Sequence, residues 1–286
     1  MMIKKHIIIW LIIISGLFYI MFKNYAEGFF LYNKMTDDSY IKKIALHGTP
    51  EELDFLVKKI GVDVNADYGC ATLLTASING LIINKGVPPE NTIKKINLLI
   101  EAGADVNLTT CRISPLTTVV LLPRKMNEFK MLLADEIDYQ LDDSDNICNI
   151  DGISKKCKET SPEERNRMKE KVISDIEKEE KILETYYARI IDILLQNGAD
   201  INKKTGGITP LHITAMAYPN ESLFLLKKLL EKGANPNIRD YKGSTPLFVA
   251  NFSNNTDTIK LLKLYGADET LRNNKGLTYT ESEKGN

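Results

Sequence analysis

The sequence predicts an all-α solenoid in which about six copies of one helical unit stack side by side. One observation is a repeated phrase: Gly-Ile-Thr-Pro-Leu-His at 207–212 returns as Gly-Ser-Thr-Pro-Leu-Phe at 243–248. A second is a repeated loop, Gly-Ala-Asn at 233–235 and Gly-Ala-Asp at 266–268, whose glycines are 33 residues apart. A fixed period of this length indicates units that bury their core against their neighbours. Such a chain leaves a long outer surface for contact with other molecules.

Weaker copies of the loop extend the repeat toward the N-terminus. The copy at 132–138 is degraded, with Glu136 in place of the glycine. The expected units end near Asn65, Asn107, Gln140, Asn202, Asn237 and Thr270. They place the repeat domain at residues 37–283.

Each unit carries signals for a pair of helices. Thr209-Pro210 and Thr245-Pro246 can each begin a helix, because proline is tolerated in the first turn and threonine can cap free amides. An apolar stripe at 223, 226, 229 and 230 has the spacing of one buried face of a second helix. Gly233 suits a left-handed C-cap. The residues at 238–243 then read as a turn that projects toward the next unit.

These phrases resemble the ankyrin-repeat family over roughly residues 37–283, most strongly in the last two full repeats. The resemblance implies antiparallel helix pairs with hairpin-like fingers at right angles to them. It also implies a concave surface for protein partners, formed by the fingers and the first helix of each pair. His212 belongs to the family's Thr-Pro-Leu-His phrase, and the resemblance assigns it hydrogen bonds between adjacent turns.

A polar insert at about 141–170 interrupts the repeats. Ser161-Pro162-Glu163 has the form of a helix start, and no glycine or proline follows until after Asn197. We therefore expect a long helix at 162–196, whose second half is the second helix of a repeat. Its charged first half is either a solvated extension or an arm that contacts a partner.

The N-terminus is predicted to direct the chain to a membrane. A short basic segment at 1–6 precedes an apolar run at 7–22, and a linker follows at 23–36. The run fits either a signal anchor or a signal peptide, and a poor cleavage site favours the anchor. Lysines before the run place the repeats on the exported side. Since abundant Ile, Lys and Asn are typical of an AT-rich genome, we expect a bacterial inner-membrane protein that faces the periplasm.

The four cysteines gain meaning from that location. Cys148 and Cys157 flank a short polar loop, and in an oxidising compartment we expect them to form a disulfide. Cys70 and Cys111 fall on the turns of adjacent repeats, where they either bridge the two turns or stay independent thiols. A zinc site is disfavoured because no CxxC pair is present.

No catalytic or cofactor-binding motif is present in the sequence. The chain lacks a phosphate-binding loop, a GxSxG elbow and an HExxH pair. Its net charge of −1 gives no overall attraction to nucleic acid. We therefore expect a non-enzyme with no cofactor, no metal, no nucleic-acid partner and no small-molecule substrate.

The ankyrin resemblance places a candidate protein-binding surface on the fingers and first helices. The finger residues are Tyr68, Arg112, Lys203, Lys204, Arg239, Tyr241, Lys242, Arg272 and Lys275. Met216 and Phe252 occupy equivalent first-helix slots, and we expect them to line the groove beside the fingers as an apolar patch. Because the finger charges are mostly positive, they either bind an acidic protein surface or merely solvate the fingers.

Two functions follow from this surface and the N-terminal segment. The first is a membrane-tethered module that binds a protein in the periplasm. The alternative is a secreted effector that acts on host proteins after its leader is removed.

Overall fold

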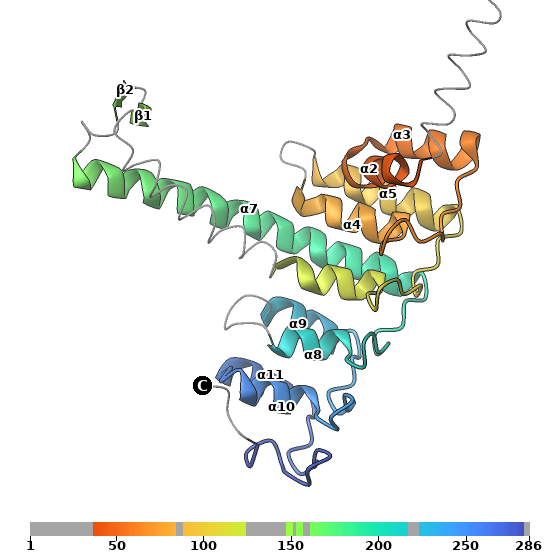
Figure 1. Ribbon diagram of the computed structural model, residues 1–286. Helices are drawn as coiled ribbons and strands as arrows, with labels where there is room; N and C mark the ends of the chain where they lie inside the picture. The colour runs from red at the N-terminus through yellow and green to blue at the C-terminus, as the bar shows by residue number, and fades with distance from the viewer. Residues whose placement is uncertain are drawn as a thin grey trace, which may run out of the picture.

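The computed structural model describes residues 37–83, 88–123, 147–150, 153–156, 161–216 and 223–282. Within these ranges, five helix pairs stack side by side (Figure 1). The first helices are α2 (Asp38–His47), α4 (Leu73–Ile83), the helix at 115–123, α8 (Pro210–Met216) and α10 (Pro246–Phe252). The second helices are α3 (Pro50–Phe55) with the π-helix η1 (Leu56–Ile60), α5 (Pro89–Glu101), the C-terminal half of α7 (Pro162–Gln196), α9 (Leu223–Glu231) and α11 (Thr256–Leu264).

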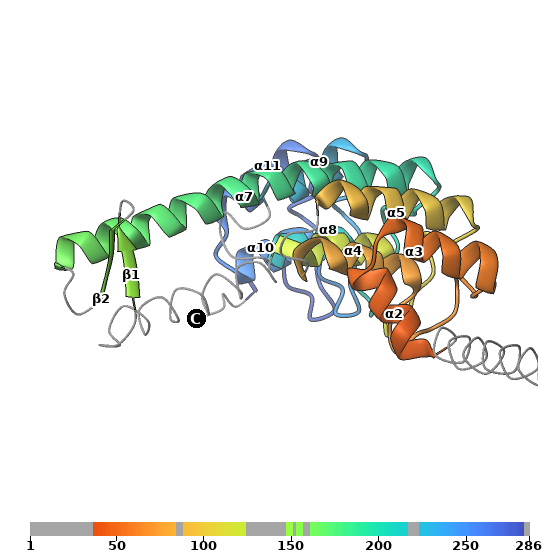
Figure 2. The same ribbon diagram turned by 90° about the horizontal axis from the view of Figure 1, so that it is seen from above.

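The first and second helices form two layers, and the core lies between them (Figure 2). Apolar residues at helical spacing, such as Leu225, Leu226 and Leu229 on α9, are fully buried in this core. Burial of apolar surface stabilises the stack by about 25 cal/mol per Å². Neighbouring units must stack to achieve it, because no single helix pair can cover its own apolar face.

Two helix starts follow capping signals in the sequence, and a third departs from its signal. Thr49 and Ser161 form capping boxes with the glutamates three residues on, and a proline follows each of them. Thr245, in contrast, makes no capping hydrogen bond, and its buried Oγ1 has no partner among the described atoms.

The second helices end at a glycine in the left-handed conformation, as predicted. Gly233 has a φ of +89°, and its N–H donates to the carbonyl of Leu230 at 3.0 Å. The next amide, that of Ala234, donates to Leu229 at 3.0 Å. These bonds satisfy the last carbonyls of α9 and turn the chain toward the following finger.

The unit expected to end near Gln140 does not separate its neighbours in the stack. Asn107 donates from Nδ2 to the carbonyl of Gly198 at 2.8 Å, and the N–H of Asp200 donates to Asn107 Oδ1 at 2.8 Å. These two turns are therefore direct neighbours. Gln140 itself lies outside the described residues. The prediction of a sixth stacked unit at this place was wrong, because loop phrases in the sequence do not reveal which turns touch.

Helix α7 spans Pro162–Gln196, the range expected for the long helix. Its first half projects from the stack on the side away from the fingers (Figures 1 and 2). Two short strands, β1 (Ile147–Ile150) and β2 (Ile153–Lys156), pair antiparallel near the free end of this arm. The fold is therefore not purely helical. Ile150 pairs with Ile153, and the Asp151-Gly152 between them in the sequence is a pair that is common in hairpin turns.

Besides Gln140, the basic segment at 1–6 and part of the insert at 141–170, three further predictions fall partly or wholly outside the described residues. These are the apolar run at 7–22, the linker at 23–36 and the Cys148–Cys157 disulfide, since Cys157 is not described. None of the helices that the structure does describe is both long and apolar enough to cross a membrane.

Candidate functional site

Five finger turns project from one side of the stack, the side on which the first helices begin. We number them finger 1 to finger 5, at residues 61–72, 103–114, 198–209, 233–245 and 266–278. At the base of finger 4, Asn237 donates from Nδ2 to the carbonyl of Gly266 at 3.0 Å and accepts from the N–H of Asp268 at 2.7 Å. Asn65 makes the same pair of bonds from finger 1 to finger 2, at 3.0 and 2.8 Å. The fingers are thus bonded into one row.

The tips of fingers 2 and 3 are tight hairpin turns with both central residues at positive φ. In finger 3 these residues are Gly206 and Gly207, with φ of +62° and +87°. In finger 2 they are Cys111 and Arg112, with φ of +46° and +65°. Glycine adopts this conformation without steric cost, whereas other residues adopt it at a cost of about 1 kcal/mol each. The tip of finger 2 therefore needs a compensating interaction.

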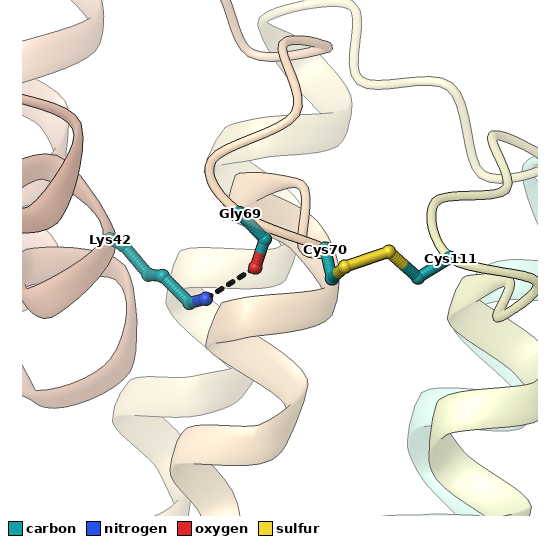
Figure 3. The surroundings of a disulfide bond; sticks show 4 residues. All are labelled: Lys42, Gly69, Cys70 and Cys111. Atoms are coloured by element: carbon teal, nitrogen blue, oxygen red, sulfur yellow. Dashed lines mark hydrogen bonds between the residues drawn. A yellow bond between two sulfur atoms is a disulfide. The ribbon is translucent and has the colours of Figure 1, made fainter.

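A disulfide between Cys70 and Cys111 joins the tips of fingers 1 and 2, with the two Cα atoms 5.1 Å apart (Figure 3). Lys42 on α2 adds a bond from Nζ to the carbonyl of Gly69 at 2.7 Å, beside the disulfide. The alternative that sequence analysis left open is thus resolved in favour of the bridge between neighbouring fingers.

The remaining tips interlock through packing and hydrogen bonds. The side chain of Arg112 lies against Gly206, and the ring of Tyr241 packs on Gly207 so closely that an added methyl group there would come within 3.1 Å of the ring. In finger 5, the N–H of Asn274 donates to the carbonyl of Lys242 at 3.0 Å. The tips of fingers 1 to 4 are therefore each in contact with the next one along the row.

Tyr68 does not belong to the binding surface that sequence analysis assigned to it. Its side chain is only 7% exposed, and its hydroxyl donates to the carbonyl of Asp63 at 2.7 Å. Burial raises the pKa of Tyr68. The prediction was wrong because this ring packs into the hydrophobic core instead of standing at the outer edge of its finger.

The other predicted aromatic of the fingers, Tyr241, is 67% exposed at the tip of finger 4. Lys242 lies with its Nζ 5.5 Å from the centre of the Tyr241 ring, and Arg239 is exposed in the same finger. Asp240 holds this turn by accepting from the N–H groups of Lys242 and Ser244, both at 2.8 Å. The structure thus brings a cation, an aromatic ring and a rigid backbone together at one tip.

Met216 and Phe252 are 48% and 59% exposed at the C-terminal ends of α8 and α10. The hydroxyl of Ser253 donates to the carbonyl of Met216 at 3.3 Å, which ties the two helix ends together. Each of these helices has seven residues, so about 10 Å of helix separates these side chains from the fingers. The two residues share one end of the first helices but do not lie beside the fingertips, contrary to expectation.

The predicted cations of the fingers differ in exposure and in whether they bind other groups of the protein. Arg272 donates from Nη1 to the carbonyl of Gly276 at 2.7 Å and pairs with Glu281 at 3.2 Å, so it stabilises its own finger. Lys203 is half-buried, whereas Lys204 and Arg112 are exposed. The exposed cations are the ones that can meet a partner.

His212 has a structural place, as the sequence predicted. It is fully buried, and Nε2 lies 3.1 Å from the carbonyl of Ser244 in the next finger while Nδ1 lies 2.7 Å from Thr209 Oγ1. Burial lowers the pKa of His212. The equivalent residue of the next repeat is Phe248. Its ring cannot make these bonds, so the hydroxyl of Thr245 has no hydrogen-bond partner among the described atoms.

The comparisons with known proteins agree with this architecture. Residues 183–273 match the family model for ankyrin repeats, in three copies. Residues 183–273 carry ankyrin repeats. Repeats of this family form protein–protein interaction modules and are generally not enzymes. No group of three metal-binding side chains is found within the described ranges.

Several curated proteins are similar to the repeat region. The chain is 43% identical over 81 residues to the ankyrin repeat-containing protein P1E11.10 of Schizosaccharomyces pombe, a match that covers 28% of this chain and 35% of that one. It is 40% identical over 90 residues to the putative ankyrin repeat protein FPV031 of fowlpox virus, covering 30% and 26%. It is 35% identical over 96 residues to Rabankyrin-5 of Mus musculus, covering 30% and 8%. The match thus spans much less than two thirds of each relative.

Proposed function

We propose that this protein is a non-enzymatic module that binds a protein partner through its fingers. The observation that carries this proposal is the rigid, interlocked tip of finger 4, where Tyr241 is exposed beside Lys242 and Arg239. Aromatic and arginine side chains in a fixed geometry are the usual anchors of protein interfaces, because little side-chain entropy is lost on binding. Met216 and Phe252 provide a second, apolar contact region at the far end of the first helices.

The partner is expected to present an acidic surface to the fingers. The chain as a whole has a net charge of −1, yet its exposed fingertip side chains are mainly cationic. Such local charge speeds association and selects partners of opposite sign more than it raises affinity.

The proposed location is the exported side of a membrane, with the apolar run at 7–22 as a tether. The run and its preceding lysines support this location, and the Cys70–Cys111 bridge is consistent with an oxidising compartment. A secreted effector that has lost its leader would share the disulfide and the repeats. An intact-mass measurement on the mature protein distinguishes the two, since only the tethered form retains residues 1–22.

The binding proposal is tested by cross-linking and affinity capture with three forms of the protein. The double variant Tyr241→Ala/Phe252→Ala removes the exposed anchors, and truncation of such an anchor typically weakens binding about thirtyfold. Lys94→Glu is the matched control, because it changes an exposed residue on α5, which is the second helix of its pair and lies away from the fingers. We expect one partner to be recovered with the wild type and the control but not with the double variant. Equal recovery with the folded double variant would move the site elsewhere, for example to the arm of α7.

The location is tested separately with a reporter fused after Asn286. A phosphatase that is active only after export should be active, with the fusion protein in the membrane fraction. Activity of a cytoplasm-only reporter would overturn the proposed location without affecting the binding proposal.

A further inference from the structure

Most cations on the second helices are paired within the molecule, although exposed lysines such as Lys59 and Lys94 form no ion pair among the described residues. Lys228 and Lys232 on and after α9 both lie 2.7 Å from Asp192 on α7. Arg189 on α7 lies 2.8 Å from Glu90 on α5. Further pairs within single second helices are Lys58–Asp54, Lys227–Glu231 and Lys260–Asp257. The outer layer therefore has little unsatisfied positive charge to offer a partner.

The fingertips differ from the outer layer in this respect. Fingers 2 to 5 each present at least one exposed cation, and we take one from each finger as a set that we call the fingertip row. Its members are Arg112, Lys204, Lys242 and Lys275. In the part of the chain that the structure describes, none of the four forms an ion pair. Their charge is therefore available for an external anion.

Asp240 and Asp200 in these fingers form no ion pair with the row among the described residues, because backbone amides hold their carboxylates. Asp240 accepts from two N–H groups of its own turn at 2.8 Å, and Asp200 accepts from the N–H of Asn202 at 2.8 Å. A carboxylate that already accepts such bonds is fixed at the base of the turn, facing the backbone. The cationic side chains remain at the outer edge.

The spacing of the fingertip row is set by the fold. Lys242 and Lys275 occupy the same slot of successive turns, 33 residues apart, and each turn is closed by an Asp or Asn that accepts from the lysine N–H. Packed neighbouring helices lie about 8–10 Å apart, so the fingers repeat at about the same interval. The interlocked tips, from the Cys70–Cys111 bridge to Asn274, keep that interval fixed.

We propose that the fingertip row binds an extended acidic peptide segment, with one carboxylate at each finger. A chain extended as a polyproline-II helix has three residues per turn and advances about 3.1 Å per residue, so an acidic side chain at every third residue recurs on one face at about 9 Å. That interval matches the row, whereas acidic residues that are adjacent in sequence would reach only one finger. The proposal rests on the proposed function and names the form of the partner that the fingers accept.

The test uses two fluorescent peptides of about twelve residues that contain four aspartates each, a length set by three intervals of the row. One has aspartate at every third residue and the other has its four aspartates in a cluster, with serine and glycine elsewhere in both. Binding to the whole protein is measured by fluorescence anisotropy at low and at physiological salt. We expect the spaced peptide to bind at least about fivefold more tightly, because only it can engage all four cations.

Variants of the protein assign the binding to the row. Lys204→Glu and Lys242→Glu should each weaken the spaced peptide roughly tenfold, since each loses an attraction and gains a repulsion. Lys94→Glu on α5 changes the net charge by the same amount and should leave binding unchanged. Circular dichroism checks that all three variants fold.

The remaining outcomes overturn the proposal in distinguishable ways. Equal affinity for the spaced and clustered peptides would refute the proposed match between the acidic spacing of the peptide and the spacing of the fingers. Equally tight binding of a single-stranded oligonucleotide of the same charge would refute a peptide-specific site. If neither peptide binds while a folded partner is captured by the wild type and lost with Lys242→Glu, the proposed function survives and the extended-segment inference fails. If no partner is captured at all, both fail.

Discussion

Fingers 1 and 2 are joined at their tips by the Cys70–Cys111 disulfide, whereas fingers 3 and 4 are joined by the ring of Tyr241 packed on Gly207. The turn of finger 3 uses two glycines, and the turn of finger 2 has Cys111 and Arg112 at the same strained positions. The N-terminal fingers thus depart from the repeat phrase where the backbone is most demanding. A covalent bond compensates for that departure.

The buried layer shows a second difference of the same kind. Lys95 stands eight residues before Gly103, as Leu225 stands eight residues before Gly233. Both side chains are fully buried, but Lys95 donates from Nζ to the carbonyls of Ala45 and Leu46, at 2.7 and 3.2 Å. A lysine thus replaces a core leucine and closes the end of α2. The comparison teaches that the N-terminal repeats keep the fold with specific bonds where the C-terminal ones use glycine and apolar packing.

Removal of the finger disulfide is expected to have the largest effect. The double variant Cys70→Ser/Cys111→Ser removes a disulfide between residues with a sequence separation of 41. In the chain-entropy model, the free energy of unfolding should fall by about 4 kcal/mol. Urea unfolding of the wild type and the variant measures this loss, and reductant should produce it in the wild type alone. The control is Cys148→Ser/Cys157→Ser, whose insert lies outside the stacked repeats and should leave the melting temperature nearly unchanged. A stable double variant at 70 and 111 would mean that the strained tip needs no bridge.

The buried Lys95 predicts an alkaline pH dependence that the leucine in the equivalent slot of α9 cannot produce. Burial lowers the pKa of Lys95 from 10.5 to about 8, although attraction to Glu52 opposes the shift. Between these two values the unfolded state binds more protons, so the free energy of unfolding should rise with pH through this window, by up to about 3 kcal/mol. Urea titrations from pH 7 to about 10.5 measure the rise.

The substitution Lys95→Leu should abolish this rise, since it restores the residue type of the equivalent slot in α9. Its matched control is Lys94→Leu, which removes the neighbouring exposed lysine and should preserve the slope. Identical slopes for the wild type and Lys95→Leu would show that Lys95 is not held in the conformation described.

The smallest effect is expected from the asparagines that the two regions share. Asn65→Ala and Asn237→Ala each remove two hydrogen bonds between adjacent fingers and should each cost about 1 kcal/mol, because these groups are exposed to water. Thermal unfolding compares them. A cost confined to Asn237 would indicate that the disulfide alone sets the spacing of fingers 1 and 2.

The sequence predicted the local elements well because their signals are local. Ser161-Pro162 and the absence of glycine up to Asn197 were sufficient for the bounds of α7, and Gly233 marked the end of α9. The stacking order could not be read in this way. Whether the loop at Asn107 touches the one at Gly198 depends on where the intervening chain goes, which no loop phrase encodes.

The binding surface was predictable only in part for the same reason. Tyr68 and Tyr241 both lie near the tips of their fingers in the sequence, yet one ring folds into the core and the other lies exposed on Gly207. The pairing of Cys70 with Cys111 depended on the lateral distance between fingers, which tertiary packing sets. The positive sign of the fingertips was visible in the sequence, but the lack of internal partners for those charges was not.

Site-specific photo-crosslinking in the native host tests the central claim, that the fingertips are the surface that binds the partner, most directly. A benzophenone side chain is placed at position 241 on finger 4, at position 94 on α5, or at position 167 on the arm of α7, all of which are exposed. We predict that irradiation links a partner protein from position 241, not from positions 94 or 167. A crosslinked partner from position 167 with none from position 241 would contradict the claim and assign binding to the arm.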